Sequence, residues 1–125
     1  MSVLLDTSIV IEMLRGTKPA LAYARSLTEP PTCSEITRFE ILRGVRGDER
    51  RMTERLLGTI RWAPVDESVA RRAGELGRRY RSSHHGLATA DLVIGASAIE
   101  LGLELATLNV RHFPMVSGLA APYTT

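Results

Sequence analysis

The sequence predicts an α/β fold in which helices cover a parallel sheet. The first observation is Val3-Leu4-Leu5, a run of aliphatic residues without alternation, which is typical of a strand buried on both faces. The second is that short strand-like segments alternate with helical apolar patterns along the whole chain. With 125 residues, we expect one domain over 1–125, large enough for a hydrophobic core.

The first half of the chain predicts four helices and three strands, with proline and glycine marking several ends. After the strand at 3–5, the predicted elements are a helix over 9–14 capped by Ser8, a helix over 19–27, a strand over 32–34, a helix from Ser34 or Glu35, a helix over 48–57 and a strand over 60–65. Pro64 favours an edge position for the last of these strands. The helix after the second strand has an apolar stripe that we expect to serve the core: Ile36, Phe39, Leu42 and Val45.

The second half predicts a central helix flanked by amphipathic and polar segments. In order, the predicted elements are a helix from 67 to 82 or 83 capped by Asp66, a polar loop over 83–86, a helix over 90–101 capped by Thr89, a strand over 103–108 ending at Asn109, one helical turn over 110–113 and a weak strand over 119–123. The helix over 90–101 is apolar nearly all round, so we expect other elements to pack on several of its sides.

Composition excludes some protein classes. No apolar run is long enough to span a bilayer, and the chain opens directly on a strand rather than on a signal peptide. Cys33 is the sole cysteine, which excludes an internal disulfide and favours the reducing cytoplasm. Lys18 is the only lysine, and arginine suits phosphate contacts. A genome rich in arginine codons explains the same bias, and a net charge of +2 does not demonstrate a nucleic-acid partner.

Two acidic residues stand in apolar surroundings in the first half. Asp6 follows the first strand, where open α/β sheets bind ligands; alternatively, it only complements a helix dipole. Glu40 lies one turn after Ile36 on the same helix face and therefore points toward the covered side; alternatively, it pairs with Arg43.

Two more polar residues occupy comparable positions in the second half. Asp91 opens the most buried predicted helix, where it can also act as a dipole partner. Asn109 closes a strand, as Asp6 does, although asparagine is also a common turn residue. Burying several like charges together is very costly, and a hard divalent cation removes that cost. Oxygen ligands favour Mg²⁺ or Mn²⁺ over zinc.

Four stretches together resemble a known family. They are Leu5-Asp6-Thr7-Ser8, Phe39-Glu40-Ile41-Leu42-Arg43-Gly44, Thr89-Ala90-Asp91-Leu92-Val93-Ile94-Gly95-Ala96 and Leu105-Ala106-Thr107-Leu108-Asn109-Val110-Arg111-His112-Phe113. Each is weakly specific, but their order and the chain length are those of PIN-domain ribonucleases. In particular, the sequence resembles the VapC toxins of bacterial VapBC toxin–antitoxin pairs.

The resemblance implies a three-layer α/β/α sandwich with a central, mainly parallel sheet, and an acidic pocket that binds Mg²⁺ or Mn²⁺ and cleaves RNA endonucleolytically. Asp6, Glu40 and Asp91 match the family carboxylates and would be the metal ligands. The fourth position, often an aspartate, falls on Asn109, or alternatively on His112, so the fourth carboxylate is absent. We therefore do not expect the site to hold two metal ions, although we still expect the acidic pocket itself.

Roles follow from the implied chemistry. A metal held by Asp6 and Asp91 lowers the pKa of a bound water, while Glu40 ligates through water or accepts the proton. Asn109, the fourth catalytic candidate, would hold a water through its amide. Ser8 is a candidate hydrogen-bond partner of Asp6. The candidates for holding the RNA backbone are Arg43, Arg111 and His84.

The resemblance also implies partners. The substrate would be cellular RNA, either tRNA or rRNA, and a VapB-like antitoxin would insert an arginine among the carboxylates. We expect its amphipathic segment to lie in a groove whose apolar walls come from two sets of residues: Ile9, Val10, Met13 and Leu14, and Leu42 and Val45. Much of this apolar stripe must also serve the core, so we expect only its outer edge to be free for the partner. A two-fold homodimer is expected, giving a heterotetramer or larger assembly with the antitoxin.

Three alternatives remain open. A receiver-like signalling domain needs a lysine at a strand end, and Lys18 is elsewhere; a glycine-rich phosphate loop is also absent. A catalytically inactive PIN domain that acts as a binding partner is consistent with the missing fourth acid. A cysteine hydrolase would use Cys33, but a thiol in a buried strand is usually inert.

Overall fold

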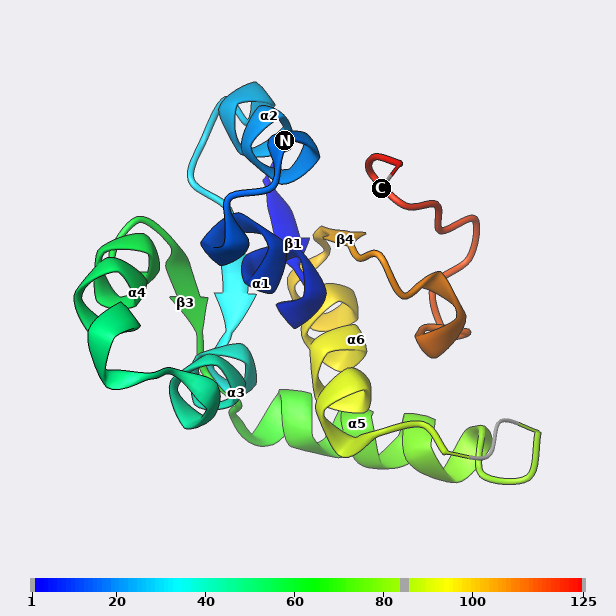
Figure 1. Cartoon of the computed structure of the whole chain (residues 1–125). Helices are drawn as coiled ribbons and strands as arrows, with labels where there is room; N and C mark the ends of the chain where they lie inside the picture. Colours follow the sequence, from blue (N-terminus) through cyan, green and yellow to red (C-terminus); the bar gives the residue numbers. More distant parts are fainter. Residues whose placement is uncertain (1, 84–85, 125) are drawn as a thin grey trace.

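The computed structural model describes residues 2–83 and 86–124. Within them, four parallel strands form one sheet in the order β3-β2-β1-β4 (Figure 1). The strands are β1 (Val3–Leu5), β2 (Thr32–Ser34), β3 (Arg61–Ala63) and β4 (Glu104–Ala106). The predicted parallel sheet is confirmed, and so is the edge position of β3.

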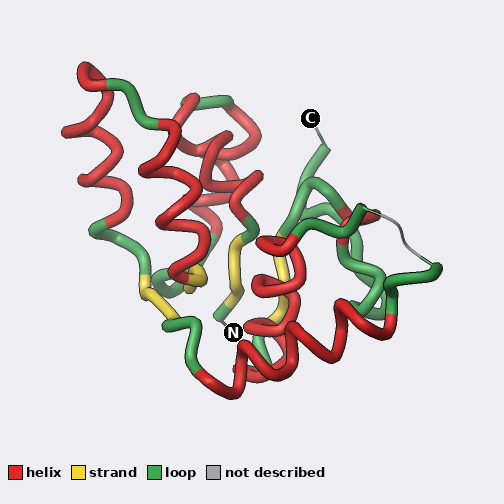
Figure 2. Tube along the Cα trace, turned by 90° about the horizontal axis from the view of Figure 1, so that it is seen from below, coloured by secondary structure: helices red, strands yellow, loops and turns green. Residues whose placement is uncertain are grey.

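Helices cover both faces of this sheet (Figure 2). They are α1 (Thr7–Arg15), α2 (Lys18–Ser26), α3 (Glu35–Gly44), α4 (Arg50–Leu57), α5 (Glu67–Arg79) and α6 (Thr89–Leu101), with short 3₁₀ helices η1 (Gly47–Glu49) and η2 (Val110–His112). None of the helices in the described segments is both long and apolar enough to cross a bilayer.

The two faces of the sheet have separate apolar cores. Leu5 belongs to a core formed with α1, α2 and α4, whereas Leu4 packs with α6 and Phe113 on the opposite face. Both leucines are fully buried, because successive side chains of a strand point to opposite faces. α5 packs on the outside of α6. The expected three-layer α/β/α sandwich is therefore confirmed.

The start of α1 differs from the prediction. The helix begins at Thr7, two residues earlier than expected, and Asp6 is the N-cap residue without a side-chain capping bond. Ser8 does not cap the helix, because it lies inside the first turn and its hydroxyl donates to Asp6. Gly16 ends α1 with a φ of 71°, a left-handed conformation that glycine adopts without strain.

Of the other two predicted caps, one is confirmed and one is wrong. Asp66 Oδ1 accepts a bond from the Val69 N–H at 3.0 Å, as predicted. Ser34, at the predicted start of α3, also caps its helix, because its Oγ accepts a bond from the Ile36 N–H at 3.2 Å. Thr89 is not a cap: α6 already includes it, and the N-cap position falls on Ala88. Residues 93–98 are buried, so the prediction that this helix lies centrally is correct.

One prediction of burial is only partly correct and one prediction of secondary structure is wrong. Of the predicted α3 stripe, Ile36 packs against the core, whereas Phe39 is 55% and Leu42 is 37% exposed. Instead, Thr37 and Ile41 are the buried residues of α3, because this helix presents a partly polar face to α1 at the edge of the sheet. Residues 119–123 form no strand; Tyr123 packs on Tyr23 with ring centroids 5.7 Å apart.

Candidate active site

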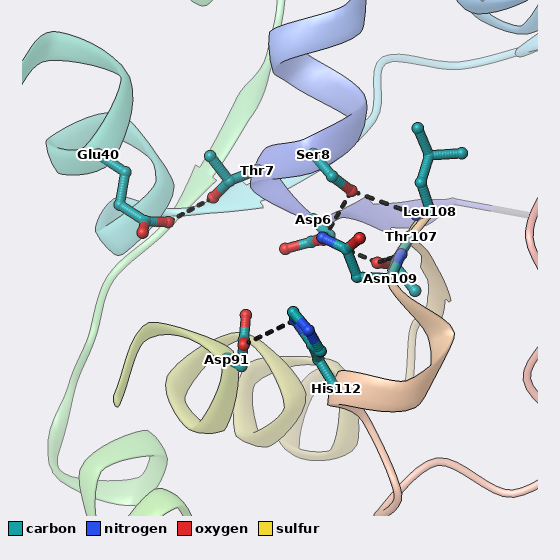
Figure 3. Close-up of polar contacts among 9 residues, drawn as sticks. All are labelled: Asp6, Thr7, Ser8, Glu40, Asp91, Thr107, Leu108, Asn109 and His112. Carbon is teal, nitrogen blue, oxygen red and sulfur yellow. Dashed lines mark hydrogen bonds and ion pairs between the residues drawn. The ribbon is translucent and has the colours of Figure 1, made fainter. Parts of the chain in front are cut away.

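The four predicted site residues come from four segments that meet at the carboxyl edge of the sheet. Asp6 follows β1, Glu40 lies in α3, Asp91 is in the first turn of α6 and Asn109 follows β4. Parallel strands end at the same edge, so residues distant in sequence converge there. Figure 3 shows the four side chains arranged around one space.

Asp6 is the most constrained of the four. It is 3% exposed, and its Oδ2 accepts hydrogen bonds from Ser8 Oγ and Thr107 Oγ1, both at 2.7 Å. Both hydroxyls bond the same oxygen, so Oδ1 remains to bind a ligand (Figure 3). The predicted bond between Ser8 and Asp6 is confirmed.

Thr107 is a site residue that the sequence analysis missed. It is fully buried, and its hydroxyl both donates to Asp6 and accepts a bond from the Asn109 N–H at 2.9 Å. It therefore connects the ends of β1 and β4. The available signal was its position directly after Ala106, the same position relative to β4 that Asp6 has relative to β1.

Glu40 points toward the covered side of α3, as predicted. Its Oε1 accepts a hydrogen bond from Thr7 Oγ1 at 2.7 Å (Figure 3). The alternative ion pair with Arg43 is not formed: the Arg43 guanidinium lies over the Phe39 ring, 5.2 Å from its centroid. A hydrogen bond from Thr7 in α1, and not an ion pair with Arg43, therefore holds the Glu40 carboxylate.

Asp91 has an unfavourable environment for its negative charge. Burial raises the pKa of its carboxyl above the ordinary value, and the charges of Asp6 and Glu40 raise the pKa further. His112 acts in the opposite direction, with Nδ1 3.2 Å from Asp91 Oδ2. The three carboxylates therefore share one electrostatic environment, which a bound cation would relieve.

The metal prediction has a donor set of the right type. Within residues 2–83 and 86–124, no three His, Cys, Asp or Glu side chains are grouped closely enough to hold one metal ion. However, Mg²⁺ is usually bound through one or two carboxylates and keeps several waters. Asp6 and Asp91 therefore fit a hard divalent cation chemically, with Glu40 as a further oxygen donor.

The remaining candidates are the three residues expected to hold the RNA backbone and the cysteine of the hydrolase alternative. Arg111 is exposed on η2 next to His112, and Arg43 lies on the outward face of α3. His84 lies outside the described residues. Cys33 is buried, and burial raises the pKa of its thiol to about 12, which argues against the cysteine hydrolase.

A groove of about 460 Å³ lies between α1, α3 and α4 and reaches one of the candidate acidic residues, Glu40. Its apolar wall consists of Ile11, Leu14, Ile41, Val45 and Met52, and Glu40 also lines it. Ile9, Val10 and Met13 do not line this groove but belong to the core, which agrees with the expectation that only the outer edge of the stripe is free. Leu14 and Val45 were predicted correctly, whereas Leu42 is not part of this groove.

Comparison with known proteins agrees with this geometry. Residues 3–118 match the family model of the PIN domain. The chain belongs to the PIN domain family. This PIN domain is 43% identical to Ribonuclease VapC19 of Mycobacterium tuberculosis over 123 residues, covering 96% of this chain and 98% of VapC19. It is 41% identical to Ribonuclease VapC10 of the same organism, covering 97% and 92% of the two chains.

A solved structure also matches this PIN domain over its whole length. A chain of a toxin–antitoxin complex from Klebsiella pneumoniae superposes with a TM-score of 0.85 at 27% identity, covering 99% of this chain and 100% of that chain. The resemblance to VapC proteins inferred from the sequence motifs is therefore confirmed.

Proposed function

We propose that this PIN domain, acting as one domain over residues 1–125, is a metal-dependent endoribonuclease toxin of the VapC type. The main support is the convergence of Asp6, Glu40 and Asp91 at one sheet edge, where burial and mutual repulsion raise the pKa of Asp91. The names of its relatives, Ribonuclease VapC19 and Ribonuclease VapC10, support RNA as the substrate class.

The proposed cofactor is Mg²⁺, for which Mn²⁺ can substitute, held directly by Asp6 and Asp91 and, through a metal-bound water, by Glu40. When bound, such an ion supplies a water of lowered pKa and offsets charge on the phosphate. Asp6 offers Oδ1 because Oδ2 is occupied by Ser8 and Thr107. Glu40 accepts the proton or holds a water, since Thr7 bonds Oε1 and leaves its second oxygen available.

The proposed substrate is cellular RNA, tRNA or rRNA. Asn109 and His112 lie beside Asp6 and Asp91 (Figure 3). Arg111 is exposed on the same 3₁₀ turn as His112 and is our first candidate for binding the RNA backbone. The Asn109 amide is a donor and acceptor without charge, so it can hold a water or a phosphate oxygen. Arg43 is a second candidate for the backbone on α3.

The proposed regulator is a VapB-like antitoxin. An amphipathic segment would place apolar side chains against Leu14, Val45 and Met52, and the same groove leads to Glu40. An arginine from that segment would pair bidentately with the carboxylates and compete with metal and RNA. We further propose a cytoplasmic homodimer that forms a heterotetramer or larger complex with the antitoxin.

A second candidate is a catalytically inactive PIN domain that only binds its partner. Asn109 favours it, because an amide supplies no negative charge where the family often has an aspartate. The carboxylate pocket favours the nuclease. Cleavage assays can separate the two.

The experiment is cleavage of total tRNA and rRNA with Mg²⁺ or Mn²⁺, with EDTA and the Asp6→Asn variant as controls. We expect cleavage only with metal and an intact Asp6. Full activity in EDTA would exclude the metal mechanism. Absence of cleavage with either ion, combined with tight binding of an antitoxin tail, would favour the inactive alternative.

A further inference from the structure

The side chains of Thr37, Thr7 and Glu40 form a chain of hydrogen bonds that begins on the buried side of α3. Thr37 is fully buried, and its Oγ1 lies 2.9 Å from Thr7 Oγ1. Thr7 is 8% exposed, and its Oγ1 lies 2.7 Å from Glu40 Oε1. Thr37 and Glu40 are three residues apart in α3, so their side chains lie on the same side of that helix.

The direction of these hydrogen bonds follows from counting protons. A carboxylate only accepts, so the Thr7 hydroxyl must use its one proton for Glu40. The Thr7 oxygen is then an acceptor in its contact with Thr37, and Thr37 must be the donor. The order of donation is Thr37 to Thr7 to Glu40, and a hydroxyl that accepts in this way becomes a stronger donor.

Thr37 also selects the conformation of Thr7. A threonine in a helix divides between two χ1 rotamers, because its hydroxyl can bond a backbone carbonyl of the preceding turn. Only a rotamer directed at α3 allows Thr7 to bond both Thr37 and Glu40. Since Thr37 is buried in α3, it provides a fixed donor that favours this rotamer.

We propose that Thr37 is a positioning residue that orients the Glu40 carboxylate through Thr7. Its effect on metal binding rests on the proposed function, in which Glu40 helps to hold the ion. Hydrogen-bonding partners behind metal ligands typically contribute about 10–100-fold to metal affinity or activity. Loss of the Thr37 hydroxyl should therefore weaken metal binding although Thr37 is not one of the proposed ligands.

The experiment compares the full chain with Thr37→Val, which removes the hydroxyl at nearly constant shape, and Thr37→Ser, which keeps it. Three-bond couplings from backbone N and C′ to Cγ2 of Thr7 report its χ1 rotamer by NMR without metal. Mn²⁺ titration by calorimetry gives affinity. Ser97→Ala is the control, because it deletes a buried hydroxyl that donates to the Val93 carbonyl of its own helix.

We expect one Thr7 rotamer in the unmodified protein and in Thr37→Ser, and rotamer averaging in Thr37→Val. Mn²⁺ affinity should fall about ten-fold in Thr37→Val and stay unchanged in the Ser and Ser97→Ala variants. On a Glu40→Ala background, Thr37→Val should have no further effect on affinity, because its action passes through Glu40.

Each other outcome has a defined meaning. Averaged Thr7 couplings in the unmodified protein overturn the proposal even where Thr37→Val does not fold. Unchanged couplings in Thr37→Val, or an equal loss of affinity with and without Glu40, also overturn it. A protein that binds no Mn²⁺ or cleaves no RNA refutes the proposed function instead, and the Thr7 couplings still decide the positioning role.

Discussion

Nδ1 of His112 lies 3.2 Å from Oδ2 of Asp91, a carboxylate whose negative charge is disfavoured by its surroundings. His112 opposes the upward shift of the Asp91 pKa, whereas burial, Asp6 and Glu40 cause it. His112→Ala should therefore raise the Asp91 pKa further. A carboxyl-carbon NMR titration in EDTA measures this pKa. An unchanged value would mean that His112, which is 52% exposed, is screened by solvent.

Asp91→Asn should stabilise the metal-free protein near neutral pH. The folded-state pKa of Asp91 lies above its ordinary value of 3.8, so the ionised group costs folding free energy. This cost is complete above the folded-state pKa and disappears as pH falls toward 3.8. Thermal unfolding in EDTA should show a higher Tm for Asp91→Asn near neutral pH and convergence with the unmodified protein in acid. A gain that grows on acidification would contradict this.

Thr107→Val should reduce RNA cleavage about 10–100-fold, because Asp6 loses one of the two hydroxyls that fix its Oδ2. Thr107→Ser keeps the donor and should retain most activity. Rates at saturating Mg²⁺ and circular dichroism of both variants separate the lost hydrogen bond from a folding defect. Equal losses in the two variants would point to packing instead.

Asn109→Asp should tighten Mn²⁺ binding. Asn109 follows Thr107, which bonds Asp6, so a carboxylate here would add negative charge near the proposed ligands. Calorimetry should show one site or none in the unmodified protein, and higher affinity in the variant. Two tight sites in the unmodified protein would refute the expectation based on the missing fourth acid.

Cys33 should resist alkylation in the native state. Its thiol is buried with a pKa of about 12, so almost no thiolate forms in a mildly alkaline buffer. Iodoacetamide followed by mass spectrometry should leave native protein unmodified and label the protein in guanidinium. Rapid native labelling would show that β2 opens locally.

The sequence was sufficient to predict those site residues that stand at the end of a strand or at the start of a helix. Asp6 and Asn109 follow strands and Asp91 opens a helix, so the convergence of parallel strand ends predicted their meeting. It was insufficient for Thr7, Thr37 and Thr107, because a hydroxyl's role depends on which distant oxygen faces it. Each of these three threonines bonds a residue from another segment of the chain.

Periodicity failed for a related reason. The spacing of Phe39 and Leu42 identifies a helix side but not what lies opposite, and in α3 that side faces outward. The inward side contacts α1 through threonines, which hydropathy does not mark as buried. Ser8 was mistaken for a cap because cap propensity ignores a nearby carboxylate that accepts the same hydroxyl.

The hydrogen bond between Asp6 and Thr107 joins residues 101 positions apart, and β1 pairs with both β2 and β4. During synthesis on the ribosome, β1 is made well before its β4 neighbour, because the two strands lie about 100 residues apart in the sequence. Until residues 104–109 have been made, the Asp6 carboxylate has neither the Thr107 hydroxyl nor the Asn109 side chain beside it. A nascent chain that stops before Thr107 therefore lacks a complete pocket, so the proposed nuclease cannot become competent until this segment has been made and has folded onto β1.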